Sequence, residues 1–512
     1  MRESWESKIG MILAMAGSAI GLGNFLRFPV KAAENGGGAF MIPYFVCFLL
    51  LGIPLMWIEW SLGRAGGARG HGTTPFLLQG ILNRPWVKYV GVLGVAIPTA
   101  FTAFYMCIES WCLAYAFFTA SGKFAGMADL SSMTSFLSEF QGRAQGEHFQ
   151  SILPLVGFFL VTLVVNVWVL SRGIAMGIER VVRIAMPLLF LMAVLLLIRV
   201  LTLPAQGAGQ SVAAGLAYVW EPDFSKLGNA NAWVQAAGQI FFTLSVGMST
   251  IMVYASYVSR KDDIALSGLA TAMTNETAEV VLGGSIAIPA AVVFFGVAGT
   301  AAIASGGAFN LGFEAMPLIL AYMPMGQLFG TFWFLLLFLA GLTSSMATSQ
   351  VAIAFLQDEL GMHRRRAVGM MMAVVGSIGL WISLTLANGV LDEFDFWSGT
   401  IGLVGFALIE AVFFAWILGM PKGWKELHEG AFIKVPRIFY YIMKYVTPVM
   451  LVALTLWWII QDAPAVIMME GKNPEDIPQL WIARGIMVGL FLWLAFLVRK
   501  AMQLQKEKGA NQ

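Results

Sequence analysis

Long apolar segments follow one another along almost the whole chain, and each is long enough to cross a lipid bilayer. A crossing helix needs about 20 apolar residues, which leaves room here for about twelve spans. Only 12% of the residues are charged, about half of the usual fraction in a soluble domain. We predict spans at residues 9–29, 40–60, 87–118, 152–170, 174–203, 233–258, 264–297, 326–356, 367–386, 397–418, 438–460 and 486–498. The sequence therefore predicts an all-α polytopic membrane protein.

Positive charges between these spans set the predicted orientation. Lysine and arginine are enriched in cytoplasmic loops. Alternate loops are rich in them, as at Arg64–Arg69, Arg364–Arg366 and Arg499–Lys500, whereas the opposite loops hold little more than Lys123, Arg143, Lys226 and Lys472. With an even number of spans, both termini are expected in the cytoplasm. The first apolar run shows no convincing signal-peptide cleavage site, which favours a plasma or inner membrane protein.

Composition also excludes several classes of function. A net charge of +2 argues against nucleic-acid binding. The three cysteines lie in apolar segments and the four histidines are scattered, so neither a disulfide framework nor a thiolate metal site is indicated. A membrane enzyme would need a nucleophile–base pair or a metal site, and we predict that this chain is not an enzyme.

Two of the predicted spans are interrupted near their midpoints by small and polar residues. The first contains GSAIGLGN at residues 17–24, and the sixth contains FTLSVGMS at residues 242–249. The two lie five spans apart, so the second copy is inverted relative to the first. Single glycines in membrane helices are also explained by close helix packing. Paired interruptions, however, indicate a transporter binding site, because freed backbone groups are tolerated only beside protein or a water-filled cavity.

Four stretches resemble a known family: GSAIGLGNFLRFP at residues 17–29, ENGGGAFMIPY at 34–44, NETAEVVLGGSIAIP at 275–289 and AGLTSS at 340–345. They closely resemble the neurotransmitter:sodium symporter family, over most of the chain. The resemblance implies a single transmembrane transporter domain over 1–512 with a five-plus-five inverted repeat, about 9–203 and 233–418, and two additional C-terminal helices at about 438–498. It implies broken first and sixth helices and leaves open a homodimer in the lipid membrane.

The resemblance also implies two sodium sites. The first would use the Ala19 carbonyl with Asn24, Thr243 and Asn275, completed by the substrate carboxylate. The second would use the carbonyls of Gly17, Ile20 and Ala340 with the hydroxyls of Thr343 and Ser344. Oxygen ligands of this kind suit a hard cation. Taken alone, Thr343 and Ser344 are better explained by hydrogen bonds to their own helix, and only their place in AGLTSS favours the site.

A substrate pocket is implied between the two breaks. Free amides near Ala19 and Gly23, with the Tyr105 hydroxyl, would receive a carboxylate, and Phe242 would help to close the pocket. The implied pocket residues are Ser18, Ala19, Gly21, Gly23, Phe101, Tyr105, Phe242, Thr243, Ser245, Met248, Ser344 and Thr348. Against the family's leucine-binding pattern, Phe101 is bulkier, Met248 replaces an aromatic residue, Thr348 replaces isoleucine and Ser18 replaces asparagine. None of these wall residues is charged, so we expect a neutral amino acid as the substrate.

Gate residues are implied on both sides of the pocket. Arg27 and Asp395 resemble an outer pair that faces across a vestibule through water. The inner gate would combine Arg2 and Asp358 with Trp5, Ser256 and Tyr257. A lone Arg2 is otherwise explained as a positive cytoplasmic charge.

Acidic residues inside spans are costly and are candidates for function. Glu59, Glu109, Glu276 and Glu279 qualify, and Glu59 is expected to bind freed amides at the sixth-span break. Chloride-dependent members of the family have a small hydroxyl residue in place of Glu279, beside Tyr44, Gln239 and Thr243. A carboxylate there supplies the negative charge itself, which implies transport without chloride.

The expected function is thus sodium-coupled import of a neutral amino acid by alternating access. Two alternatives remain open: transport of a non-α amino acid or related amine, and a sodium-dependent sensor that does not move its ligand. An ion channel would need a continuous pore lined by polar rings, whereas the polar residues here converge on one centre.

Overall fold

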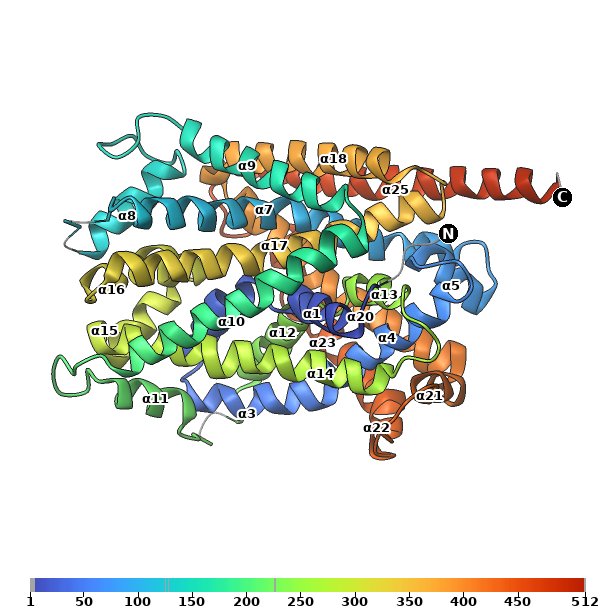
Figure 1. The fold of residues 1–512 in the computed structure, drawn as a ribbon, viewed down its shortest axis with the longest axis horizontal. Helices are drawn as coiled ribbons and strands as arrows, with labels where there is room; N and C mark the ends of the chain where they lie inside the picture. Colours follow the sequence, from blue (N-terminus) through green and yellow to red (C-terminus); the bar gives the residue numbers. More distant parts are fainter. Residues whose placement is uncertain (1–4, 125, 128, 225–226, 511–512) are drawn as a thin grey trace.

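The computed structural model describes residues 5–510, except residues 125, 128, 225 and 226. Within them the chain is a bundle of helices, most of which run along the long axis of the molecule (Figure 1). Inside a membrane every backbone polar group must be paired within the segment, which is why apolar runs become helices. The two ends of the chain lie at the same end of the bundle, and α8 lies at the other end (Figure 1).

The first half of the chain forms α1 (Lys8–Ala19), η1 (Gly23–Arg27), α2 (Phe28–Glu34), α3 (Gly38–Cys47), η2 (Phe48–Gly52), α4 (Ile53–Gly67), α5 (Thr74–Leu82), α6 (Val87–Gly91), α7 (Leu93–Ala120), α8 (Leu130–Phe140), α9 (Leu153–Leu170), η3 (Ile174–Glu179), α10 (Arg180–Leu201), α11 (Val212–Trp220), α12 (Ala230–Leu244) and α13 (Thr250–Ala255).

The second half forms α14 (Ile264–Glu276), η4 (Thr277–Gly284), α15 (Ser285–Ser305), η5 (Asn310–Ala315), α16 (Met316–Tyr322), α17 (Gly326–Asp358), α18 (Arg364–Leu384), η6 (Leu386–Asn388), α19 (Val390–Phe394), η7 (Asp395–Ile401), α20 (Gly402–Val412), η8 (Phe413–Gly419), α21 (Met420–His428), α22 (Ile438–Tyr441), η9 (Ile442–Val446), α23 (Thr447–Gln461), α24 (Ala463–Ile467) and α25 (Ile477–Ala510).

Every predicted span contains a helix. By length and hydropathy, the described residues hold 10 helices able to cross a membrane, or up to 11 if the bent pair α1 and η1–α2 is counted as one span. The predicted sixth span is not among them, because it is divided into α12, with 15 residues, and α13, with 6. The predicted multi-pass architecture is confirmed.

Both predicted interruptions are breaks in the backbone. Helix α1 ends at Ala19, and Ile20 adopts an extended conformation with φ −73° and ψ 96°; the two halves of this span are bent by 47°. Between α12 and α13, positive φ angles occur at Ser245 (53°), Gly247 (78°) and Ser249 (58°). Such left-handed residues cannot continue a right-handed helix, so carbonyl and amide groups are released inside the bundle.

Several functional candidates lie in π-helical turns. Asn24 and Arg27 belong to η1, Glu279 to η4 and Asp395 to η7. A π-turn widens the helix by one residue and is frequent at functional sites. In the centre of the bundle, α7 packs along α17 (Figure 1). The halves α1 and α13 of the two broken spans both pack against α17.

Candidate functional site

The break after α1 is held open by side-chain hydrogen bonds. The Gly21 amide donates to Asn24 Oδ1 at 2.8 Å, and the Leu22 amide donates to the Tyr105 hydroxyl at 2.8 Å. A Cβ atom at Gly21 would lie 2.6 Å from the Tyr105 hydroxyl and 2.8 Å from Ser344 Oγ. Only glycine therefore allows α7 and α17 to approach the break this closely.

Four residues predicted for the first sodium site converge beside this break. Asn24 Nδ2 donates to Asn275 Oδ1 at 2.8 Å. The terminal atoms of the Asn275 amide lie 3.3 Å from the carbonyl oxygens of Ala19 and Thr243, and 3.0 Å from Thr243 Oγ1. All four residues are buried. Uncharged amide, hydroxyl and carbonyl oxygens collected in one place are the ligands of a hard monovalent cation.

Of the residues predicted for the second sodium site, Gly17 of α1 meets Thr343 and Ser344 of α17. Ser344 Oγ approaches the Gly17 carbonyl at 3.5 Å and the Ser18 carbonyl at 3.3 Å. Gly17 lies so close to α17 that an added Cβ would be 3.2 Å from Thr343 Cβ. Thr343 Oγ1 donates to its own helix at Ala340 and Leu339, 3.1 Å each. The back-bonding expected of a membrane threonine is thus present, and the hydroxyl oxygen keeps free acceptor lone pairs.

The predicted pocket between the breaks is walled by aromatic rings. Phe101 stacks on Tyr105 with ring centroids 4.9 Å apart and lies 5.8 Å from the Phe242 ring. Gly23 fits beneath Phe242, because a Cβ atom there would be 2.6 Å from the ring. Ser245 Oγ donates to the Ser18 carbonyl at 2.8 Å, joining the two broken spans.

Phe101, Met248 and Thr348 form one wall of the predicted pocket. Of these three side chains, Thr348 alone carries a polar group, its hydroxyl. Its hydroxyl accepts a hydrogen bond from Thr102 Oγ1 at 2.7 Å and donates to the Ser344 carbonyl at 3.1 Å. Both interactions stay within the wall, so this hydroxyl is already engaged. Met248 is buried beside the second break, with 1% of its surface exposed, and supplies a pliable apolar contact.

A cavity of about 430 Å³ opens above the pocket. Tyr105 and Phe242 form part of its lining, together with Arg27 and Asp395 from η1 and η7. The Arg27 guanidinium lies 4.3 Å from the centre of the Phe242 ring. Within the described residues no hydrogen bond reaches Arg27 Nη1 or Asp395 Oδ1. The predicted outer pair therefore lines the same cavity, and these two atoms do not pair with each other.

An acidic group outside the spans also lines this vestibule. Glu314 in η5 accepts a hydrogen bond from Thr134 Oγ1 at 2.8 Å. Burial raises the pKa of the Glu314 carboxyl, and the hydrogen bond and the charge of Arg143 oppose that shift. Sequence reasoning missed this residue, because it lies in an apolar loop that gave no motif.

On the opposite side of the pocket the bundle is closed by aromatic packing. Trp5 packs edge-on against Tyr254 with ring centroids 5.2 Å apart, and its Nε1 donates to the Tyr254 carbonyl at 3.2 Å. Tyr257 accepts a hydrogen bond from Gln350 at 3.2 Å. Gln350 in turn accepts one from Arg364 at 2.9 Å. The sequence did not predict a gate role for Tyr254, Gln350 or Arg364.

Three other predicted inner-gate positions have different outcomes. Ser256 follows the last residue of α13 and donates to the Val253 carbonyl at 2.6 Å. Asp358 is the last residue of α17. Arg2 lies outside the described residues.

Glu279 lies next to the first sodium site. Its carboxylate accepts hydrogen bonds from Gln239 Nε2 at 2.7 Å and from the Thr243 hydroxyl. Asn24 Nδ2 lies 3.3 Å away. The hydrogen bonds of the Tyr44 hydroxyl, at 2.9 and 3.1 Å, go to Glu276. Of the three expected neighbours of Glu279, Gln239 and Thr243 bind it directly, whereas Tyr44 binds the acid one turn earlier.

Three further acids are buried inside the bundle. Glu59 accepts a hydrogen bond from the Gly247 amide at 2.6 Å, as expected for a group that binds amides freed at the sixth-span break. Glu109 in α7 accepts one from Asn166 at 3.2 Å. Glu410 in α20 is buried beside Glu59 and was missed. Glu410 could have been found from the sequence, because it is an acid in the middle of an apolar run.

Comparison with known proteins gives matches over nearly the whole chain. Residues 2–128 and 144–498 match the model of the sodium:neurotransmitter symporter family. An uncharacterized sodium-dependent transporter of Methanocaldococcus jannaschii is 29% identical over 467 residues, which are 88% of this chain and 89% of that protein. The sodium- and chloride-dependent glycine transporter 1 of Xenopus laevis is 25% identical over 516 residues, covering 90% of this chain and 79% of that protein.

A solved structure has the same fold. The crystal structure of MhsT in complex with L-phenylalanine superposes with a TM-score of 0.77 at 28% sequence identity. The match covers 89% of this chain and 99% of the MhsT chain.

Proposed function

The chain belongs to the sodium:neurotransmitter symporter family, and from that premise we propose that it imports a neutral amino acid with sodium by alternating access. Sodium-coupled secondary transport follows from the family, which consists of transporters and not of enzymes. The observation that carries the finer proposal is the convergence of Ala19, Asn24, Thr243 and Asn275 directly beside the pocket walled by Phe101 and Tyr105.

The proposed coupling between sodium and substrate binding follows from the charges at the first sodium site. The four protein groups at the first site are uncharged, and a substrate carboxylate placed beside them completes the coordination of a sodium ion. Sodium and substrate then stabilise each other's binding reciprocally. The second sodium ion, at Gly17, Ile20, Ala340, Thr343 and Ser344, ties α1 to α17 and so stabilises the outward-open arrangement.

The substrate class follows from the pocket wall. Phe101, Met248 and Thr348 carry no charge, and the Thr348 hydroxyl is already bound to Thr102 and the Ser344 carbonyl. A charged or strongly polar side chain would leave buried groups without partners. This supports an apolar α-amino acid and speaks against a non-α amine whose displaced polar end would need Thr348. Since MhsT was crystallised with L-phenylalanine, large apolar amino acids are the first candidates.

Uptake into vesicles tests this function. The purified protein, reconstituted in proteoliposomes, is given an inward sodium gradient and a labelled neutral amino acid, and a panel of unlabelled amino acids competes for uptake. Accumulation above the external concentration that disappears when potassium replaces sodium is the expected result. Binding without accumulation would identify a sensor, and competition by β- or γ-amino acids alone would identify the amine alternative.

We further propose that transport does not require chloride. Glu279, bound by Gln239 and Thr243, places a fixed negative charge next to the sodium ligands Asn24 and Asn275. Replacement of chloride by gluconate should leave uptake unchanged. Glu279→Ser should make uptake chloride-dependent, whereas Glu34→Ser, at a partly exposed acid at the end of α2, should not. Loss of wild-type uptake in gluconate would contradict the proposal.

The proposed setting is a cell membrane with both termini in the cytoplasm, which agrees with the positive loops and with α25 ending at the same end of the bundle at which the chain begins (Figure 1). The transport domain is proposed to comprise two inverted repeats followed by two further helices. A homodimer remains open.

A further inference from the structure

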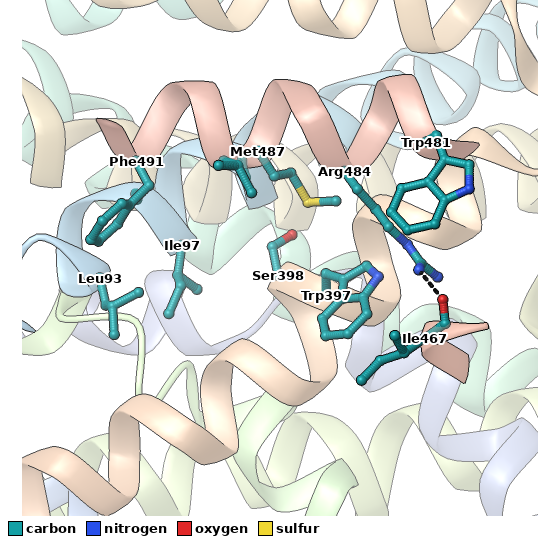
Figure 2. Close-up of a pocket in the computed structure, with 12 residues that line it drawn as sticks. Leu93, Ile97, Trp397, Ser398, Ile467, Trp481, Arg484, Met487 and Phe491 are labelled. Atoms are coloured by element: carbon teal, nitrogen blue, oxygen red, sulfur yellow. Dashed lines mark hydrogen bonds between the residues drawn. The ribbon is translucent and has the colours of Figure 1, made fainter. Parts of the chain in front are cut away.

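A groove of about 490 Å³ lies on the side of the bundle where α7, η7 and α25 meet (Figure 2). Leu93 and Ile97 of α7 line one wall, and Met487 and Phe491 of α25 line the other (Figure 2). Trp397 and Trp481 lie toward one end of it. The groove is separate from the vestibule and from the sodium and substrate residues described above, and none of the proposed transport steps uses it.

Among the described residues that line the groove, Arg484 alone is charged, and its charge is already neutralised. Arg484 Nε forms an ion pair with Glu393 Oε1 at 2.5 Å. The remaining guanidinium nitrogens donate to the carbonyls of Ile467 and Val466, each at 2.8 Å, and Trp397 Nε1 binds the same Glu393 oxygen at 2.7 Å. An anionic ligand would therefore have to break an existing pair. The rest of the lining is hydrocarbon, apart from the Trp481 indole N–H and Ser398, whose hydroxyl donates to the Phe394 carbonyl at 2.6 Å.

The length and direction of the groove match one leaflet of a bilayer. The lining residues of α25 run from Trp481 to Phe491, a distance of about 15 Å along the helix axis at 1.5 Å per residue. Half of the hydrocarbon core is also about 15 Å thick. Tryptophans and the arginine occupy one end only, as side chains do at the level of lipid headgroups.

The groove is also open to the surrounding lipid. On α25, the lining residues Trp481 and Val488 are 55% and 58% exposed. In a chain that spans a membrane, these apolar side chains face acyl chains. On the floor of the groove, Ala96 and Ala100 are 6% and 4% exposed, so a molecule that contacts them must enter the groove.

We propose that this groove binds one acyl chain of a bilayer phospholipid from the vestibule-side leaflet, with the headgroup level with Trp481 and Arg484. The bound chain lies directly behind the walls of the transport site. In η7, Asp395 faces the vestibule while Trp397 and Ser398 line the groove. In α7, Ala100 lines the groove while the next residue, Phe101, packs on Tyr105. The lipid thus fills the space behind both elements.

Photolabelling of the full-length protein tests the proposal. The protein is reconstituted in phosphatidylcholine vesicles containing a trace of phosphatidylcholine with a diazirine in the middle of one acyl chain, illuminated and mapped by peptide mass spectrometry. Adducts are expected on α7 between Ala96 and Ala100. Val488→Trp, which fills the groove from its exposed rim, should reduce these adducts by about fivefold or more, because a packed site leaves no room for the chain. Leu492→Trp, one turn further along α25, should leave them unchanged.

Ile97→Trp fills the groove from the opposite wall and gives an independent second variant, with sodium-dependent uptake as the measure of correct folding. Absence of α7 adducts, or equal α7 labelling in the wild type and both groove-filled variants, would overturn the proposal. So would a covalent dimer formed on oxidation of Met487→Cys, since a second copy of the chain would then occupy the groove. The native cysteines are all buried and give little background.

Discussion

At the scale of single residues, the site depends on small and uncharged groups placed against one another. Asn24 and Asn275 come from different spans and meet at 2.8 Å, and the Asn275 amide also lies beside the Thr243 and Ala19 oxygens. A substitution that removes one oxygen leaves the cation short of a ligand without changing the charge of the site. The consequence should appear in sodium affinity rather than in folding.

Asn24→Ala should therefore raise the sodium concentration for half-maximal uptake by about tenfold, which is about 1.4 kcal/mol of binding free energy. Thr343→Ala should weaken sodium at the second site independently. Titration of uptake with sodium at fixed substrate measures both. Asn231→Ala, at an exposed asparagine near the start of α12, is the matched control and should behave as the wild type. An unchanged sodium dependence in Asn24→Ala would remove this residue from the site.

At the scale of elements, the breaks are fixed by backbone conformations that few residues adopt. Gly247 has a φ of 78°, and a Cβ atom there would lie 2.3 Å from the Leu403 carbonyl oxygen. Its amide is the donor bound by Glu59. The sequence located both breaks from their glycines and hydroxyl residues. It did not predict that Ser245 and Ser249 adopt left-handed conformations, because serine rarely does so.

Gly247→Ala should lower thermal stability and abolish most uptake, because a strained residue of this kind costs about 1–3 kcal/mol before the clash with Leu403 is added. Gly405→Ala in α20 is the matched control, since an added Cβ meets nothing within 4 Å there, and alanine is the better helix former. Thermal unfolding in detergent and vesicle uptake measure the two effects. Equal behaviour of both variants would show that the turn tolerates a side chain.

At the scale of the whole molecule, the structure is open on one side of the pocket and closed on the other. The vestibule of about 430 Å³ reaches Tyr105 and Phe242, whereas Trp5 packs on Tyr254 beyond the pocket. Alternating access requires these two arrangements to exchange. Bound sodium and substrate shift the equilibrium between the open and the closed vestibule by the difference in their affinity for the two states.

A cysteine placed in the vestibule should report that shift. Ala308 lines the cavity. In Ala308→Cys, the reaction of the cysteine with a membrane-impermeant maleimide should slow by about tenfold when sodium and substrate together favour the closed state. Ser131→Cys, exposed on α8, should react at the same rate in all conditions. Protection of Ala308→Cys by substrate without sodium would contradict the proposed coupling.

The sequence by itself determined the membrane class, the helical segments and the two interruptions, because lipid leaves a chain no alternative to internally paired helices and because glycine clusters mark where they break. It also supplied the candidate sodium and pocket residues through family resemblance. Only the tertiary structure decided which distant groups meet. The contacts between Tyr44 and Glu276, between Trp5 and Tyr254, and between Glu393 and Arg484 depend on how the helices are rotated and packed, and no local pattern encodes that rotation.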